Sequence, residues 1–171
     1  RQPGRSLDAG PLAAAFRKQL PFTLTEGQER AIGALLADAQ SPLRMHRLLQ
    51  GDVGSGKTVA AFFACLPSFN EGLQVAWLVP TEALAQQAFS VLSPWCEKLG
   101  ISLAVLSGGI AAEQKRRILD RCASGILCCL IGTHALLQPA VVFKKLGMIV
   151  IDEHHKFGAA QRLALQEKDP A

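Results

Sequence analysis

A glycine-rich segment constrains this chain more than any other feature of its sequence. The segment Gly51-Asp52-Val53-Gly54-Ser55-Gly56-Lys57-Thr58 matches the pattern G-x-x-x-x-G-K-[ST] of a phosphate-binding loop, or P-loop. Glycines are needed because the backbone must turn its N–H groups toward a polyphosphate without obstruction from a Cβ atom. The segment lies between an apolar stretch over 44–50, predicted as a strand, and a helix predicted over 57–68. The alternative is an ordinary glycine-rich turn between a strand and a helix.

We therefore predict that all eight residues, Gly51, Asp52, Val53, Gly54, Ser55, Gly56, Lys57 and Thr58, bind a nucleoside triphosphate. Lys57 can reach the β- and γ-phosphates, and the Thr58 hydroxyl can join the coordination shell of Mg²⁺. Lys57 is thus also a candidate catalytic residue.

A pair of acids directly after an apolar stretch is the second candidate feature. Residues 147–151 lead into Asp152 and Glu153. A buried parallel strand would deliver both carboxylates to the sheet edge where such folds bind ligands. We predict that Asp152 holds Mg²⁺ through water and that Glu153 deprotonates the attacking water. The alternative is two surface acids at a strand end. His154 and His155 follow, but H-E-x-x-H spacing is absent and Mg²⁺ prefers oxygen ligands.

Short apolar stretches alternate with helical patterns along the chain, which indicates an α/β fold. The predicted strands cover 74–79, 102–106, 126–131 and 148–151, and the predicted helices cover 12–20, 25–40, 81–99 and 111–124, with a helical turn at 134–137. Uninterrupted apolar strands separated by helices are typical of a mostly parallel sheet with helices on both faces.

The cysteine content, the apolar runs and the net charge indicate the cellular compartment and the kinds of partner that we expect. The five cysteines show no C-x-x-C spacing and lie among apolar residues, so we expect buried thiols in a reducing cytoplasm. No apolar run approaches the ~18 residues of a membrane span, and residues 1–5 lack the apolar region of a signal peptide. The net charge of +4 permits nucleic-acid binding. The basic cluster over 115–121 is interpreted as a solvated helix face, with a DNA-binding patch as the alternative.

Four segments stand in a fixed order along the chain. They are Gln50 to Thr58, Pro80-Thr81-Glu82-Ala83-Leu84-Ala85-Gln86-Gln87, Ile131-Gly132-Thr133-His134-Ala135-Leu136, and Asp152-Glu153-His154-His155-Lys156-Phe157-Gly158 with Gln161-Arg162. Together they resemble superfamily 2 helicases of the DExH type, and they look most like the first motor domain of RecG-type ATP-dependent DNA helicases. His154 and Lys156 stand where RecG usually has Gln and Arg. The alternatives are a transcription-repair coupling translocase and a P-loop ATPase that does not act on nucleic acid.

The resemblance covers about residues 12–168. It implies a RecA-like P-loop NTPase domain, with residues 1–20 as a linker and N-terminal helix and residues 21–171 as the motor domain. It also implies that the chain is truncated before the strand of motif III, whose loss should leave a gap in the sheet or let another segment fill it. ATP and Mg²⁺ are the implied cofactors.

The resemblance assigns further roles by position. Gln28 would hydrogen-bond adenine, although Thr25 and Gln28 also have the spacing of a helix capping box. Branched or double-stranded DNA is the implied partner of the full-length protein. The implied DNA-backbone contacts are Thr81, Gly108, Thr133 and His134, and His155 would couple the ATP site to the DNA side. For each DNA contact, the alternative is an ordinary turn between a strand and a helix.

A second motor domain in cis is also implied by the resemblance, because in this family it supplies arginines to the ATP site. Such an arginine is worth ~10³–10⁵ in rate in related NTPases. The chain alone is therefore expected to bind nucleotide weakly and to hydrolyse ATP very slowly.

Overall fold

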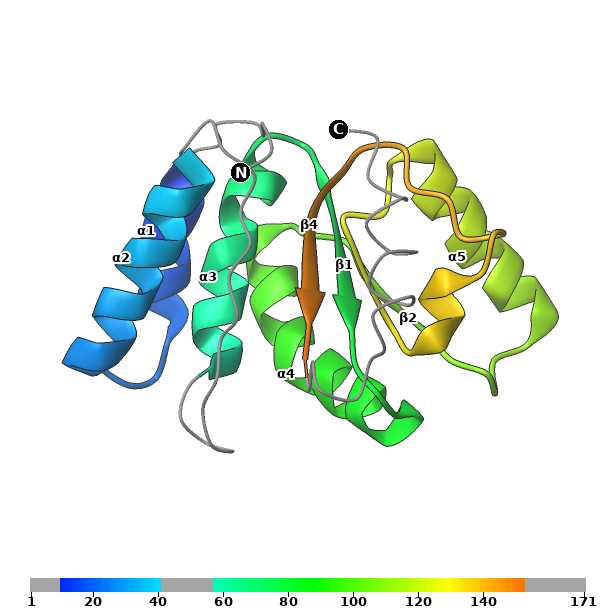
Figure 1. Cartoon of the computed structure of the whole chain (residues 1–171), viewed down its shortest axis with the longest axis horizontal. Coiled ribbons are helices and arrows are strands. Elements are labelled where there is room, and N and C mark those ends of the chain that lie inside the picture. The colour runs from blue at the N-terminus through cyan, green and yellow to red at the C-terminus, as the bar shows by residue number, and fades with distance from the viewer. Residues whose placement is uncertain (1–9, 41–56, 153–171) are drawn as a thin grey trace. The chain divides into compact units, whose positions relative to one another are not determined.

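The computed structural model describes residues 10–40 and 57–152. These residues belong to two compact units that meet in sequence between Glu71 and Gly72. The described part of the first unit consists of helices α1 (Pro11–Gln19), α2 (Glu26–Gln40) and α3 (Lys57–Asn70). The second contains β1 (Gln74–Leu78), α4 (Glu82–Leu99), β2 (Leu103–Leu106), α5 (Ala112–Ser124), β3 (Cys129–Gly132), the 3₁₀ turn η1 (His134–Leu137) and β4 (Leu146–Ile151), as Figure 1 shows.

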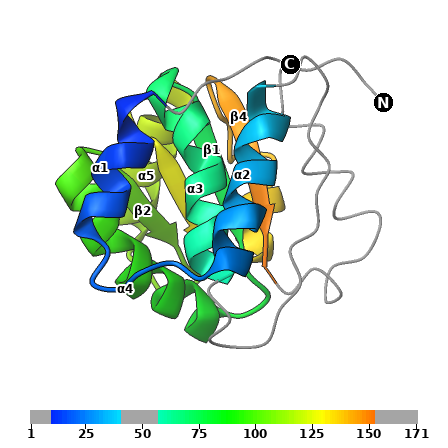
Figure 2. The same cartoon turned by 90° about the vertical axis from the view of Figure 1, so that its left-hand side faces the viewer.

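Aromatic packing holds the first unit together. Phe16 of α1 is fully buried, and its ring meets those of Phe62 and Phe63 in α3 edge-on, with both centroid distances at 4.7 Å. Helix α3 is buried on all sides from Val59 to Ser68, as expected for a helix made mostly of apolar residues. Figure 2 shows α1 and α2 beside α3. The domain boundary predicted after residue 20 stays a prediction. Phe16 packs α1 on α3, the helix that follows the P-loop segment.

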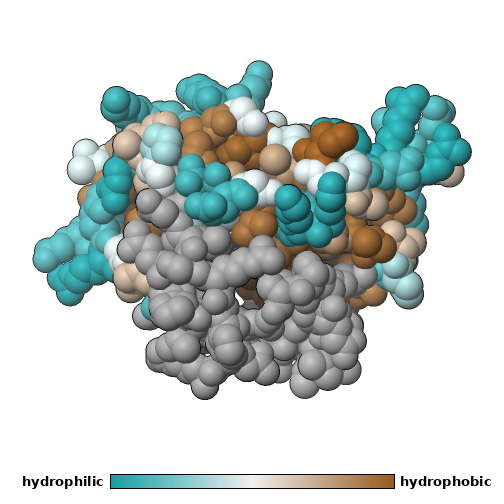
Figure 3. All heavy atoms as spheres, turned by 90° about the horizontal axis from the view of Figure 1, so that it is seen from above, coloured by the Kyte–Doolittle hydropathy of each residue, from teal (hydrophilic) through white to brown (hydrophobic). Residues whose placement is uncertain are grey.

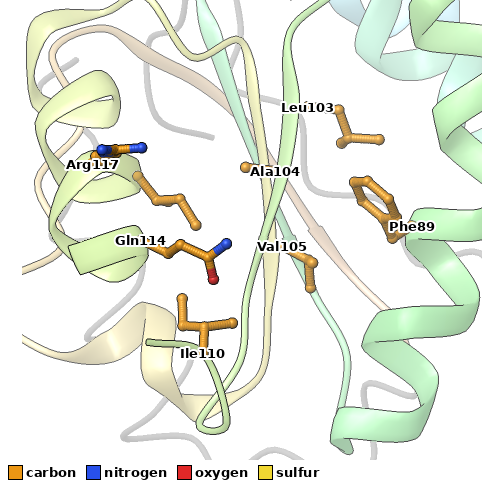
Figure 4. Close-up of a pocket in the computed structure, with 8 residues that line it drawn as sticks. Phe89, Leu103, Ala104, Val105, Ile110, Gln114 and Arg117 are labelled. Atoms are coloured by element: carbon orange, nitrogen blue, oxygen red, sulfur yellow. The ribbon is translucent and has the colours of Figure 1, made fainter. Parts of the chain in front are cut away.

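The second unit is built on a parallel sheet with the strand order β2-β3-β1-β4. All five residues of β1 are buried, which fits its central position and its uninterrupted apolar sequence. Helix α4 contacts β2 and β3, and α5 contacts β2. Figure 4 shows side chains of α4 and α5 on opposite sides of β2. The predicted parallel sheet with helices on both faces is therefore confirmed.

The start of β3 differs from the predicted strand over 126–131. The strand begins at Cys129, and Ile126 is 64% exposed. The reason is Ser102, whose hydroxyl donates to the Ile126 carbonyl at 2.8 Å and accepts from the Cys128 N–H at 2.9 Å. These bonds hold residues 126–128 in an irregular connection before the ladder begins.

Several sequence predictions lie outside the described residues. They are residues 1–9 of the predicted linker and N-terminal helix over 1–20, the strand over 44–50, the P-loop residues 51–56 and the segment after Asp152. The predicted gap in the sheet depends on the strand over 44–50 and stays a prediction.

The described surface carries isolated hydrophobic side chains. Its exposed large hydrophobic residues are Phe22, Val91, Ile126 and Val142. On the face shown in Figure 3, hydrophobic patches are interrupted by hydrophilic side chains. Among the helices of residues 10–40 and 57–152, none is both long and apolar enough to cross a membrane.

Candidate functional site

The carboxyl ends of the parallel strands gather the candidate residues of the second unit at one sheet edge. Thr81 follows β1, Gly108 follows β2, Thr133 and His134 follow β3, and Asp152 follows β4. Figure 1 shows this edge at the tips of the strand arrows. Ligands of open α/β sheets bind at such an edge. The predicted DNA contacts and the predicted Mg²⁺ ligand therefore share one edge, although they come from four separate segments.

Asp152 is fixed to the central strand by its backbone. Its N–H donates to the Leu78 carbonyl at 2.8 Å, one position beyond the last paired residue of β4. The side chain is half-buried. The carboxylate is thus delivered by the end of a parallel strand, as predicted, although β4 is half-buried after Leu146 and not fully buried as the sequence suggested. Glu153 and His155, the predicted base and the predicted coupling residue, lie outside the described residues.

Thr81 begins helix α4 as its N-cap. Its hydroxyl oxygen accepts a hydrogen bond from the Leu84 N–H at 3.2 Å, which satisfies one of the free donors of the first turn. Thr81 is exposed, so the N-terminus of α4 faces solvent. Thr81 therefore caps α4, and the remaining first-turn N–H groups make this end suited to an anion.

Glu82, to which the sequence assigns no role, links two further turns of the edge. Its Oε1 accepts a hydrogen bond from the Gly108 N–H at 3.2 Å. The Thr133 hydroxyl lies 3.5 Å from the same oxygen, a long contact. Besides its place in the segment from Pro80 to Gln87, the sequence signal for Glu82 is its position in the first turn of α4, where an acid ordinarily interacts with the helix dipole.

The turn after β3 is closely packed. A Cβ atom at Gly132 would lie 2.8 Å from two side-chain carbons of Leu136 and 3.2 Å from the Leu106 carbonyl oxygen. Thr133 is buried, whereas His134 at the start of η1 is exposed. Glycine at position 132 thus lets η1 fold back on the strand end, which presents His134 at the surface.

Lys57 and Thr58 lie in the first unit, as the first two residues of α3. Both side chains are half-buried. A helix follows the P-loop segment, as predicted, and the N-terminal end of a helix favours an anion such as a phosphate. Residues Gly51 to Gly56 lie outside the described residues.

Gln28 forms the predicted capping box with Thr25. The Thr25 N–H donates to Gln28 Oε1 at 2.8 Å, and the Gln28 N–H donates to Thr25 Oγ1 at 3.1 Å. These reciprocal bonds begin helix α2. The contact between Gln28 and adenine stays a prediction.

A hollow of about 380 Å³ lies at the β2 edge of the sheet. In Figure 4, Phe89 of α4 lies on one side of β2, and Gln114 and Arg117 of α5 lie on the other. Its lining contains none of the predicted site residues. Arg117 also pairs with Glu113 at 2.7 Å on an exposed face of α5, in agreement with the interpretation of this basic cluster as solvated.

Within residues 10–40 and 57–152, no group of three or more His, Cys, Asp or Glu side chains could hold a metal ion.

Known helicases are similar to this chain in sequence. The sequence pattern of the DEAD/DEAH box helicases matches residues 25–168. The chain belongs to the DEAD/DEAH box helicase family. It is 44% identical over 168 residues to the ATP-dependent DNA helicase RecG of Aquifex aeolicus, a match that covers 98% of this chain and 21% of the relative. It is 47% identical over 154 residues to RecG of Streptococcus pneumoniae, covering 90% of this chain and 23% of the relative.

Solved helicase structures share the fold. The structure of RecG bound to a three-way DNA junction matches with a TM-score of 0.83 and 42% identity, covering 92% of this chain and 22% of that protein. The DUF1998 helicase MrfA matches with a TM-score of 0.71 at 22% identity, which supports the fold alone. These matches confirm the RecA-like fold and the resemblance to RecG. The chain spans about a fifth of the length of the RecG relatives it matches.

Proposed function

We propose that this helicase segment is the ATP-binding motor of a longer DNA helicase or translocase that acts on branched DNA in recombination and replication-fork repair. The observation that carries the proposal is the similarity in sequence and fold to RecG, which has been seen bound to a three-way DNA junction. The shared carboxyl edge supports it, because Asp152 and the predicted DNA contacts emerge from neighbouring strands of one sheet.

ATP would be held by residues 51–56 together with Lys57 and Thr58, and Gln28 would contact the adenine. The observed start of α3 fits this role, because first-turn N–H groups favour a phosphate. Thr58 and Asp152 carry the oxygen donors that Mg²⁺ prefers. When bound, Mg²⁺ neutralises charge on the phosphates.

Hydrolysis would then depend on two groups of this chain and on one outside it. Lys57 would stabilise charge on the γ-phosphate, and Glu153 would take the proton of the attacking water. A second motor domain in cis would add arginines. The 171-residue chain alone should therefore hydrolyse ATP very slowly.

DNA would be bound at the exposed part of the carboxyl edge. Thr81, Gly108 and His134 are exposed there and Thr133 is buried beside them, and phosphate contacts of these four residues would make binding independent of sequence and sensitive to salt. His155 would couple this surface to the ATP site. We place the protein in the cytoplasm, where the free thiols of its five cysteines would stay reduced.

ATP hydrolysis by the full-length protein tests the proposal. We expect a three-way junction to stimulate turnover more than linear duplex of equal length. Lys57→Ala should lower stimulated turnover by about 100-fold or more, since one electrostatic donor to a transition state is worth ~10²–10³. The control Lys98→Ala removes an exposed lysine at the end of α4 and should leave turnover unchanged. A rate of ATP hydrolysis that is the same with and without DNA would favour a P-loop ATPase that does not act on nucleic acid.

A further inference from the structure

Glu82 occupies a position where three strand connections meet. It is the first residue of α4, and its Oε1 accepts from the Gly108 N–H at 3.2 Å. Thr133 Oγ1 lies 3.5 Å from the same oxygen. One carboxylate oxygen therefore contacts the turns that follow β2 and β3.

Backbone hydrogen bonds already hold part of this edge. The Val79 N–H donates to the Gly132 carbonyl at 3.0 Å, so the connection into α4 is tied to the end of β3. The pairing of β2 with β3 ends at Leu106 and Gly132. Beyond Leu106, the Gly108 N–H is directed to Glu82. Backbone pairing aligns β2 with β3 only as far as Leu106 and Gly132. Past these strand ends, the Glu82 side chain holds the turn that contains Gly108.

Electrostatics argues against Glu82 as a direct phosphate ligand. Its carboxylate is negative and exposed at the helix end where an anion would bind. By charge alone, Glu82 should weaken DNA binding at this edge. Glu82 can therefore strengthen DNA binding only by holding the turns of Gly108 and Thr133 in place.

We propose that Glu82 is a positioning residue of the DNA-binding edge. Its carboxylate holds the Gly108 and Thr133 turns against the first turn of α4, so that the three turns present one fixed surface to DNA phosphates. This inference rests on the proposed function. It adds a role for an acid that does not itself contact DNA.

The test compares three variants of the full-length protein in DNA-binding titrations over a range of salt. Glu82→Ala removes both the charge and the acceptor, and we expect Kd for a three-way junction to rise about ten-fold, the value of one hydrogen bond to a charged group. Glu82→Gln removes the charge but keeps an acceptor for Gly108, and it should restore most of the affinity. Glu97→Ala removes an equal charge from the exposed far end of α4 and should stay within about two-fold of wild type.

Amide hydrogen exchange of the peptide that contains residues 107–110 supplies a readout independent of DNA. Exchange at Gly108 should become faster in Glu82→Ala and remain at the wild-type rate in Glu82→Gln and Glu97→Ala. Tighter or equal DNA binding by Glu82→Ala would overturn the proposal, and so would weaker binding without faster exchange. If the wild-type protein bound no DNA, the proposed function would be wrong. Exchange at Gly108 would then test only whether Glu82 holds the Gly108 turn.

Discussion

The side-chain oxygen of Gln74 accepts a hydrogen bond from the backbone N–H of Lys145 at 2.8 Å. The amide nitrogen of the same side chain donates to the Cys122 carbonyl at 2.9 Å and to the Leu127 carbonyl at 2.8 Å. Gln74 is only 1% exposed. The buried amide of Gln74, the first residue of β1, therefore bonds backbone groups in the last turn of α5, in the connection from α5 to β3 and in the connection into β4.

Replacement of Gln74 by leucine should destabilise the fold strongly. Leucine fills a similar volume but leaves the Lys145 N–H and the Leu127 carbonyl without this partner, and each buried unsatisfied group costs about 1–3 kcal/mol, whereas the Cys122 carbonyl still accepts from the Gly125 N–H at 3.2 Å. We expect the free energy of unfolding, measured by urea denaturation, to fall by at least about 2 kcal/mol. Gln86→Leu on the exposed surface of α4 is the control and should change it by less than about 0.5 kcal/mol. Equal effects of the two variants would contradict this role of Gln74.

The packing of Phe16 gives a second stability prediction. Phe16 is fully buried against Phe62 and Phe63, whereas Phe22 is 48% exposed. Phe16→Ala should lower the free energy of unfolding by about 3–5 kcal/mol, because a buried phenylalanine leaves a cavity. Phe22→Ala is the matched control and should cost far less. A small loss for Phe16→Ala would mean that α1 does not stabilise the P-loop helix.

The sequence predicts the helices and strands of the described residues well where local chemistry sets their ends. Thr81 caps α4 at its start, and Gly100 and Gly125 end α4 and α5 with φ of 71° and 84°, values that glycine adopts without strain. Asp152 is predictable because an acid after an apolar strand must emerge at the carboxyl edge.

Contacts between distant segments could not be predicted. The start of β3 depends on Ser102, which lies 24 positions before Ile126. The role of Glu82 depends on Gly108, 26 positions away. Neither spacing leaves a periodic signal, because each contact forms only after the sheet has brought separate strands into register.

Thiol chemistry provides a third prediction. Burial raises the pKa of the Cys96 thiol to about 12 from an ordinary 9.0, and the nearby Cys128 raises it further. At pH 8.5 the thiolate population of Cys96 is therefore about a thousandfold below that of an ordinary cysteine. In native protein treated with iodoacetamide and analysed by mass spectrometry, the half-buried Cys128 should be alkylated before the buried Cys96. Early alkylation of Cys96 would contradict the structure.

The same shift makes stability depend on alkaline pH. The folded state holds the Cys96 proton more tightly than the unfolded state does. Its contribution to stability is therefore fully present below about pH 9 and is lost as the pH rises toward 12. Cys96→Ala should flatten this part of a pH–stability curve, although it also removes buried volume and lowers stability at every pH.

Gln28 offers the last prediction, because its capping and adenine-binding roles can be separated. Gln28→Glu keeps an oxygen that can accept from the Thr25 N–H, and a carboxylate near a helix N-terminus is favourable, so stability should be retained. Glutamate cannot donate to adenine, so the preference of the full-length ATPase for ATP over GTP, measured as a ratio of kcat/KM, should fall. Thr25→Ala should do the reverse: it should cost about 1 kcal/mol of stability and keep the preference. An unchanged preference in Gln28→Glu would leave Gln28 as a cap alone.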